Sequence, residues 1–158
     1  MANVELRLIE DSDLDLLFDQ MRDPESVQMA AFTAKDPNDR EAFDAHMSKV
    51  RNAPDVIMRA VTRDGQLLGS IASFDIDDQR EITYWIDRSA WGQGIASQAL
   101  ALFLDVEKVR PLHARAASDN VGSLRVLRKA GFTIVNTEIS YASARDAEIE
   151  ETCLQLTA

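Results

Sequence analysis

The sequence predicts a chain of mixed α/β (α+β) class, with about seven strands and about four helices. Three observations support this class. Segments with period-two alternation occur beside segments with helical spacing of apolar residues. An Asp-Gly hairpin signal joins two of the alternating segments. Further along, a glycine-rich turn leads from an alternating segment into an apolar run, which begins a strand–helix–strand unit.

The N-terminal third of the chain first alternates and then takes helical spacing. Residues 3–10 alternate and predict the first strand. The sequence DSD at residues 11–13 caps a helix with one apolar face, and Pro24 ends that helix. Residues 25–34 are predicted to be irregular, or a short helix and a loop, and the dipeptide Asp36-Pro37 opens a further helix.

The middle of the chain predicts three antiparallel strands. Residues 55–63 and 67–75 alternate, and Asp64-Gly65 between them is a strong hairpin signal. A second turn at Asp77-Asp78 leads into a strand over residues 80–87.

The C-terminal half contains the strand–helix–strand unit. Residues 95–106 predict a helix that is apolar nearly all round, so we expect burial on both of its sides. A strand at 111–117 precedes another helix, which Asp119 caps and Gly131 ends. The last two strands are predicted at residues 132–142 and 147–157.

Composition restricts the class of function. A chain of 158 residues suits one domain, residues 1–158. The net charge of −10 argues against nucleic-acid or anionic-membrane binding. No apolar run is long enough to span a membrane, and the acidic N-terminus is not a signal peptide. The single Cys153 suits the cytoplasm, and the two histidines lack the spacing of metal ligands, so no metal is expected.

The turn WGQGIAS at residues 91–97 predicts an anion site. A turn between a strand and a helix presents free backbone N–H groups at the positive end of the helix dipole. Gly92 and Gly94 lack Cβ, so the backbone can approach a ligand closely or take a positive φ. A phosphate is the usual ligand of such a turn, although an ordinary strand-to-helix connection has the same pattern.

Positive charge is concentrated just after this turn. Residues 108–129 contain six basic residues and a single acidic residue, Asp119. This zone fits a polyanionic cofactor, but it also fits a solvated helix face, because Arg125, Arg128 and Lys129 share one side of a helix. The six basic residues are Lys108, Arg110, Arg115, Arg125, Arg128 and Lys129.

The order strand, WGQGIAS, helix, strand, DNVGS, helix, GF over residues 80–135 resembles the GNAT family of acetyl-CoA-dependent N-acetyltransferases. The nearest resemblance is to the branch of ribosomal-protein N-terminal acetyltransferases, whose turn often reads WGQGIA. Residues 3–75 fit the family only in layout. The resemblance implies a mixed, twisted sheet that splays between its fourth and fifth strands, with acetyl-CoA in the gap.

The resemblance also implies which residues hold acetyl-CoA. The turn supplies backbone N–H groups and one hydroxyl to the pyrophosphate, and the strand before it pairs with the pantetheine amides through its backbone. Trp91 stands where the family usually has Arg or Gln, which removes one charged contact. Asn120 suits a pantetheine contact, or alternatively caps the helix. The expected cofactor residues are Trp85, Ile86, Trp91, Gly92, Gln93, Gly94, Ile95, Ala96, Ser97, Asn120 and Ser123.

Two residues are expected to take part in catalysis. Glu81, on the strand before the turn, is the candidate base that deprotonates the amine, directly or through water; its alternative role is a strand carboxylate paired with a neighbouring Lys or Arg. Many GNAT enzymes use a tyrosine on the second helix as the acid, but no tyrosine occurs between residues 86 and 140. The resemblance therefore implies that Ser123 donates a hydrogen bond to the departing thiolate of CoA. Tyr84 and Trp85 are expected to point to opposite faces of their strand.

The predicted function is direct acetyl transfer from acetyl-CoA to a primary amine, either the α-amine of a protein or peptide or a small-molecule amine. Two alternatives stay open. One is a non-catalytic acyl-CoA-binding module on the same fold, since fold does not fix function. The other is a dinucleotide-binding oxidoreductase, because Gly92-x-Gly94-x-x-Ser97 half-matches the dinucleotide fingerprint. A homodimer through the C-terminal strands is possible.

Overall fold

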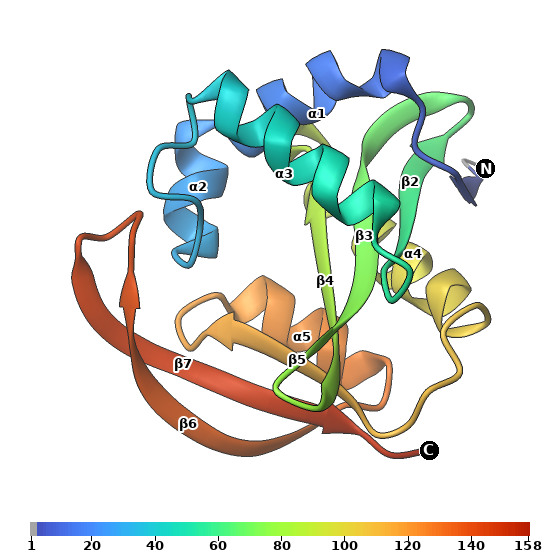
Figure 1. Ribbon diagram of the computed structural model, residues 1–158. Coiled ribbons are helices and arrows are strands. Elements are labelled where there is room, and N and C mark those ends of the chain that lie inside the picture. The colour runs from blue at the N-terminus through green and yellow to red at the C-terminus, as the bar shows by residue number, and fades with distance from the viewer. Residues whose placement is uncertain (1–2) are drawn as a thin grey trace.

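The computed structural model describes residues 3–158, in which seven strands form one sheet of order β1-β2-β3-β4-β5-β7-β6. All neighbouring strands are antiparallel except β4 and β5, which are parallel (Figure 1). The strands are β1 Val4–Arg7, β2 Ile57–Arg63, β3 Gln66–Ile76, β4 Gln79–Ile86, β5 Leu112–Ala117, β6 Thr133–Ala142 and β7 Ala147–Leu156.

Helices cover both faces of this sheet. Helices α1 and α3 lie over one face of β3 and β4, while α4 and α5 lie against the other face (Figure 1). No helix within the described residues has the length and apolarity of a membrane span. The α-helices are α1 Leu14–Met21, α2 Pro24–Ala30, α3 Arg40–Asn52, α4 Ile95–Leu104 and α5 Val121–Lys129, and two 3-10 turns are η1 Asp11–Asp13 and η2 Arg88–Ala90.

The larger core lies between the sheet and the pair α4 and α5. It contains the completely buried Leu100 and Phe103 of α4, packed with Ile71 of β3, Leu112 of β5 and Leu127 of α5. The prediction that α4 is buried on both sides is wrong, because only one side of this helix meets the sheet. Leu102 on the other side is 39% exposed.

Helix α1 ends at Met21, before Pro24, and the short helix expected after it is α2, which Pro24 begins, since a proline at the first helical position loses no hydrogen bond. Two predicted helix starts are wrong, each because a neighbouring residue makes the better cap. Helix α3 begins after Asp39, whose carboxylate accepts from the Ala42 N–H, and not at residue 36. Helix α5 is capped by Asn120 and not by Asp119.

The sheet splits between β4 and β5, as the resemblance implied. Only two residue pairs join these strands, Arg80 with Leu112 and Glu81 with His113. Beyond Glu81, β4 stays paired with β3 as far as Ile86, while β5 turns away with β7 and β6 (Figure 1). We call the resulting gap the seam. Along the seam the backbone groups of β4 that face β5 have no strand partner among the described residues, so they are free to pair with a ligand.

Candidate active site

The predicted anion-binding turn lies at the end of β4 and the start of α4. Gly92 and Gly94 both have positive φ, 75° and 77°, and an added Cβ at Gly92 would meet no atom within 4 Å. These glycines are therefore needed for backbone conformation and not for close packing. Gly94 caps α4 without any side-chain hydrogen bond, so no capping side chain occupies the first N–H groups of the helix.

Side chains of the turn hold its shape from outside. The Trp91 indole N–H donates to the Ile86 carbonyl at 2.9 Å. The Gln93 amide donates to the Ser89 carbonyl and accepts from the Arg63 guanidinium. These contacts fix the turn at residues 91–97 against its surroundings, and no side chain caps the backbone N–H groups at the start of α4.

β4 presents its backbone to the seam and its side chains to the two faces of the sheet. Tyr84 faces α5, while the Trp85 indole N–H on the other face donates to the Gln20 carbonyl of α1 at 3.0 Å. The prediction that these two residues point to opposite faces is therefore confirmed. The Trp85 carbonyl lies so close to Gly69 of β3 that a Cβ built there would be 1.9 Å from its oxygen.

The first turn of α5 brings three polar groups together across the seam. The Asn120 carboxamide oxygen accepts from the Ser123 N–H at 3.2 Å, which is the capping role considered for this residue. The Ser123 hydroxyl lies 2.8 Å from the Tyr84 hydroxyl. Burial raises the pKa of Tyr84, although the hydrogen bond with Ser123 opposes this shift. Sequence reasoning did not connect Tyr84 with Ser123, because strand alternation gives the face of Tyr84 but not its neighbour on α5.

Carboxylates surround one arginine on the α1-facing side of the seam. Arg115 of β5 donates to Glu81 at 3.0 Å, and its guanidinium also lies 3.4 Å from Glu138 and 3.7 Å from Glu151. Glu81 thus has the arginine partner considered as its alternative role. The ion pair also shows that Arg115 does not belong to the basic zone predicted for phosphate, since it lies on the opposite face of the sheet from α5.

Glu151 of β7 is a site residue that sequence reasoning missed. Its side chain is only 9% exposed, and burial raises the pKa of its carboxyl group. Its hydrogen bond from the Ser140 hydroxyl is long, at 3.4 Å. The available signal was the register of β7, where two successive glutamates interrupt the alternation, so that one of them must face inward.

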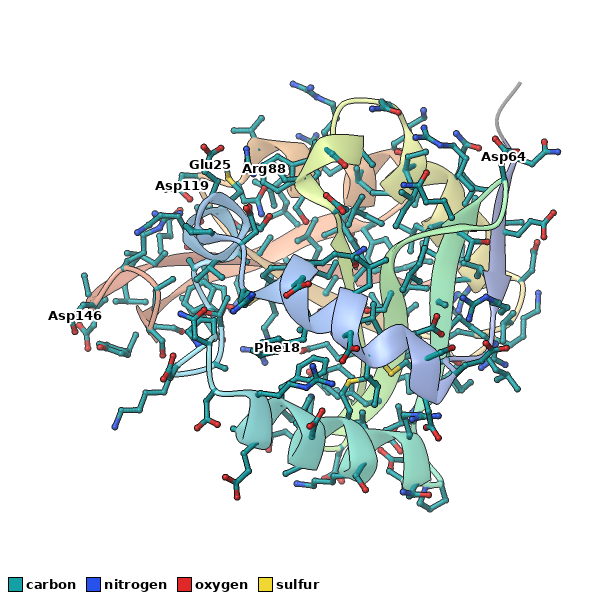
Figure 2. All side chains as sticks on the ribbon, turned by 90° about the horizontal axis from the view of Figure 1, so that it is seen from above. Phe18, Glu25, Asp64, Arg88, Asp119 and Asp146 are labelled. Carbon is teal, nitrogen blue, oxygen red and sulfur yellow. The ribbon has the colours of Figure 1, made fainter. Side chains whose placement is uncertain are left out.

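Two ion pairs close the rim of the site. Arg88, next to the anion-binding turn, binds Asp23 at the start of α2 and lies 3.4 Å from Glu25 (Figure 2). Arg145 in the β6–β7 turn binds Asp119 through two hydrogen bonds, at 2.7 and 3.1 Å. The Arg88 guanidinium lowers the pKa of Asp23 to about 2, and Arg145 lowers the pKa of Asp119. Four chain segments are therefore linked around one end of the seam.

Comparison with known families identifies this arrangement. Residues 3–133 match the profile of the acetyltransferase (GNAT) domain, which is most of the chain. The chain belongs to this GNAT family. A Bacillus subtilis protein described as the probable N-acetyltransferase YjcK is 34% identical over 77 residues. That match covers 44% of this chain and only 42% of the relative, so the chain spans less than half of that protein.

Solved GNAT structures share the whole fold at low sequence identity. A ribosomal-protein-alanine N-acetyltransferase from Brucella melitensis superposes with a TM-score of 0.81 at 18% identity, covering 98% of this chain and 99% of that one. RimJ from Mycobacterium smegmatis, solved with a CoA disulfide, gives 0.81 at 21% identity, covering 98% and 82%. A phosphinothricin acetyltransferase from Sinorhizobium meliloti, solved with acetyl-CoA, gives 0.80 at 15% identity, covering 98% and 88%.

The residues present fit the cofactor of this family, acetyl-CoA. The uncapped N-terminus of α4 suits a pyrophosphate, and the free edge of β4 suits the amides of a pantetheine arm. On α5, Arg125, Arg128 and Lys129 form no ion pair within residues 3–158, and their contact with phosphate stays a prediction. The predictions of a GNAT acetyltransferase and of acetyl-CoA as acyl donor are confirmed, while the roles of individual residues stay predictions.

Proposed function

We propose that this GNAT protein transfers the acetyl group of acetyl-CoA directly to a primary amine, namely the α-amine of a protein or peptide. The observation that carries the proposal is the seam. It opens between an anion-binding turn at one end and a carboxylate-rich face on the other side of the sheet, so that a thioester and an amine can meet from opposite sides. Acetyl-CoA supplies the activated acyl carbon, and the protein supplies alignment and a path for the proton.

The cost of deprotonation favours an α-amine. At pH 7 a lysine amine with a reference pKa of ~10.4 costs about 4–5 kcal/mol to deprotonate, whereas an α-amine near ~7.8 costs about 1 kcal/mol. Glu81, the candidate base, accepts a hydrogen bond from Arg115 at 3.0 Å, and an α-amine demands less of such a base than a lysine amine does. The likeness to ribosomal-protein acetyltransferases, among them RimL, described as a ribosomal L7/L12 alpha-N-protein acetyltransferase, supports the same acceptor.

We propose that Glu81 is the base that accepts the proton of the amine, directly or through water. Glu151 is the second candidate, because its carboxylate lies 3.7 Å from the same Arg115 and burial raises its pKa. The Glu81→Gln and Glu151→Gln variants separate them. The variant that lacks the base loses kcat most strongly at low pH, where little of the amine is neutral, while the other keeps the wild-type pH profile.

Acceptor profiling tests the proposed function. Purified protein is mixed with acetyl-CoA and a panel of amines, comprising peptides with free or blocked N-termini, lysine side-chain analogues and polyamines, and thiol release is followed. We expect turnover with the free N-terminal peptides and none with the blocked peptides. CoA binding by calorimetry without turnover on any amine would instead support the acyl-CoA-binding module, and tight NAD binding without CoA binding would support the oxidoreductase.

A further inference from the structure

The hydrogen bond between Tyr84 and Ser123 joins the two arms of the split sheet. Tyr84 lies on β4 beyond Glu81, the last residue of that strand that pairs with β5. Ser123 lies in the first turn of α5, which directly follows β5 on the other side of the seam. Their hydroxyl oxygens are 2.8 Å apart, so this contact crosses the seam on the face next to α5.

Either of these two hydroxyls can be the donor of the hydrogen bond between them. The Ser123 N–H is already bonded to Asn120, which fixes the first turn of α5. Among residues 3–158, the nearest hydrogen-bond partner of the Tyr84 hydroxyl is the Ser123 hydroxyl, and the Ser123 carbonyl is 3.5 Å away. Each hydroxyl has one proton to donate. If Tyr84 donates to the Ser123 oxygen, the Ser123 proton is free to donate to a third atom in the seam.

We propose that Tyr84 is a positioning residue that donates its hydroxyl proton to Ser123 Oγ, so that the Ser123 hydroxyl donates a hydrogen bond to the sulfur of CoA as it leaves. The inference rests on the proposed function in one respect, that the thioester passes through the seam beside Ser123. It adds the Tyr84 hydroxyl to the site, and it specifies that the hydrogen bond runs from Tyr84 to Ser123.

The chain of hydroxyls stabilises charge without moving a proton to sulfur. In the transfer, the bond from the amine nitrogen to the acyl carbon forms, the C–S bond breaks, and its electron pair stays on sulfur. The amine proton leaves through the base to water. A thiol has a pKa of ~8.5 and a phenol ~10, so complete transfer of the tyrosine proton to the thiolate is unfavourable by about 2 kcal/mol, and the proposed chain needs only a hydrogen bond. Burial raises the pKa of Tyr84 further, which keeps it a donor throughout.

The pKa of the thiol of bound CoA is a direct readout of this hydrogen bond. It is measured from thiolate absorbance in a pH titration, as the difference from the same protein loaded with desulfo-CoA, which lacks the sulfur. We expect an acid dissociation constant higher than that of free CoA in the wild type. Tyr84→Phe lowers it by about 3- to 10-fold, the effect of losing one hydrogen bond. Ser123→Ala lowers it further, and Ser123→Thr, which keeps the hydroxyl, restores it.

Tyr141→Phe is the matched control for this titration. It removes the other tyrosine hydroxyl of the chain, which is bonded to Asp146 in the β6–β7 turn, and we expect the wild-type thiol pKa. Equal thiol pKa values in the wild type, Tyr84→Phe and Ser123→Ala would overturn the inference. Should Tyr84→Phe fail to fold, the pair Ser123→Ala and Ser123→Thr still decides whether the chain reaches the sulfur.

Steady-state kinetics supply a second readout, through a double-mutant cycle. Tyr84→Phe lowers kcat by about 3- to 10-fold and changes the KM for acetyl-CoA by less than about twofold. In the Ser123→Ala background the same change has no further effect, because the tyrosine acts only through the serine. An equal loss in both backgrounds, or a rise in KM alone, would show that Tyr84 only shapes the cleft.

The two experiments separate this inference from the proposed function. If the wild-type protein binds CoA but acetylates no amine, the proposed function is wrong, and the thiol titration still decides the role of Tyr84. If the wild-type protein binds no CoA, both the proposed function and this inference are wrong. Variant thiol pKa values at the wild-type level, together with normal amine transfer, overturn only the inference.

Discussion

At the scale of single residues, Gly69 is the position where the backbone leaves least room. A Cβ at this residue would lie 1.9 Å from the carbonyl oxygen of Trp85 and 3.1 Å from the Cα of Ile86. Both are backbone atoms of β4, so no flexible side chain can move aside. Glycine is therefore required here by the close approach of two strands, on the segment of β4 that we expect to hold the pantetheine arm.

Gly69→Ala is expected to destabilise the fold by about 3 kcal/mol or more, since the new methyl group must push β3 from β4. The matched control is Gly122→Ala on α5, where the nearest atom to the new Cβ is 4.0 Å away. There we expect a gain of up to about 1 kcal/mol from helix propensity. Urea unfolding of both variants measures the difference, and equal stabilities would contradict the close contact between these strands.

At Glu151 we expect a substitution to increase the stability of the fold, whereas Gly69→Ala decreases it. Burial raises the pKa of its carboxyl group, so its charged form destabilises the folded state at neutral pH. The contribution that it makes to stability is present below the unfolded pKa of ~4.3 and is lost as pH rises through the folded pKa. Glu151→Gln should therefore raise Tm at pH 7, by about 2–4 °C if the gain is on the order of 1 kcal/mol.

This gain should shrink as the pH falls towards ~4, where the wild-type residue is also neutral. Glu148→Gln, at an exposed position of the same strand, serves as the control and should change stability by less than about 0.5 kcal/mol. Melting curves of the three proteins between pH 4 and 8 provide the comparison. A Glu151→Gln variant that is less stable throughout would mean that the attraction to Arg115 outweighs the cost of burial.

At the scale of secondary structure, the elements were predictable where periodicity and turn residues agree. The β2–β3 hairpin has both signals, and Asp64 and Gly65 take positive φ in its turn. Errors arose at helix starts, where several capping residues stand in a row. Asp119 and Asn120 are both good caps, and the choice between them depends on Arg145, which is 26 residues away and binds Asp119. A long-range ion pair of this kind leaves no local signal in the sequence.

The cap of α5 leads to a prediction about Asn120, which we have given two roles. Asn120→Ala should cost about 1 kcal/mol of stability, because the Ser123 N–H loses its acceptor. Asn120→Asp keeps the acceptor and so keeps the stability, but it lacks the N–H donor expected to bind the pantetheine arm. We therefore expect Asn120→Asp to raise the KM for acetyl-CoA with little change in Tm. A wild-type KM in this variant would leave Asn120 with the capping role alone.

At the scale of the whole molecule, the site depends on contacts that unite distant segments. The anion-binding turn was predictable because all its parts lie within residues 91–97. The carboxylate face was not, because Glu81, Glu138 and Glu151 come from three strands and meet only at Arg115. The pairing of Tyr84 with Ser123 likewise depends on how the two arms of the sheet diverge. The sequence thus predicts where the cofactor binds far better than it predicts the chemistry next to it.

The ion pair between Arg88 and Asp23 at the rim of the site predicts how the stability of the protein changes at low pH. Arg88 lowers the pKa of Asp23 to about 2, and this pair links the anion-binding turn to α2. A lowered pKa contributes stability that is present above the unfolded value of ~3.9 and lost as pH falls through the folded value. The stability that this pair contributes should therefore fall between pH ~4 and ~2, where Asp23 binds a proton in the unfolded chain but stays ionised in the folded protein.

Asp23→Asn isolates this contribution, because asparagine caps α2 as well as aspartate does but cannot form the ion pair. We expect its Tm to lie below that of the wild type at pH 6 and to fall less steeply between pH 4 and 2. Arg88→Gln removes the same ion pair and also the contact between Arg88 and Glu25, so the double variant should be no less stable than Arg88→Gln alone. Calorimetric melts across this pH range make the comparison. Parallel Tm curves for the wild type and Asp23→Asn would place the acid sensitivity in other pairs, such as Arg145 with Asp119.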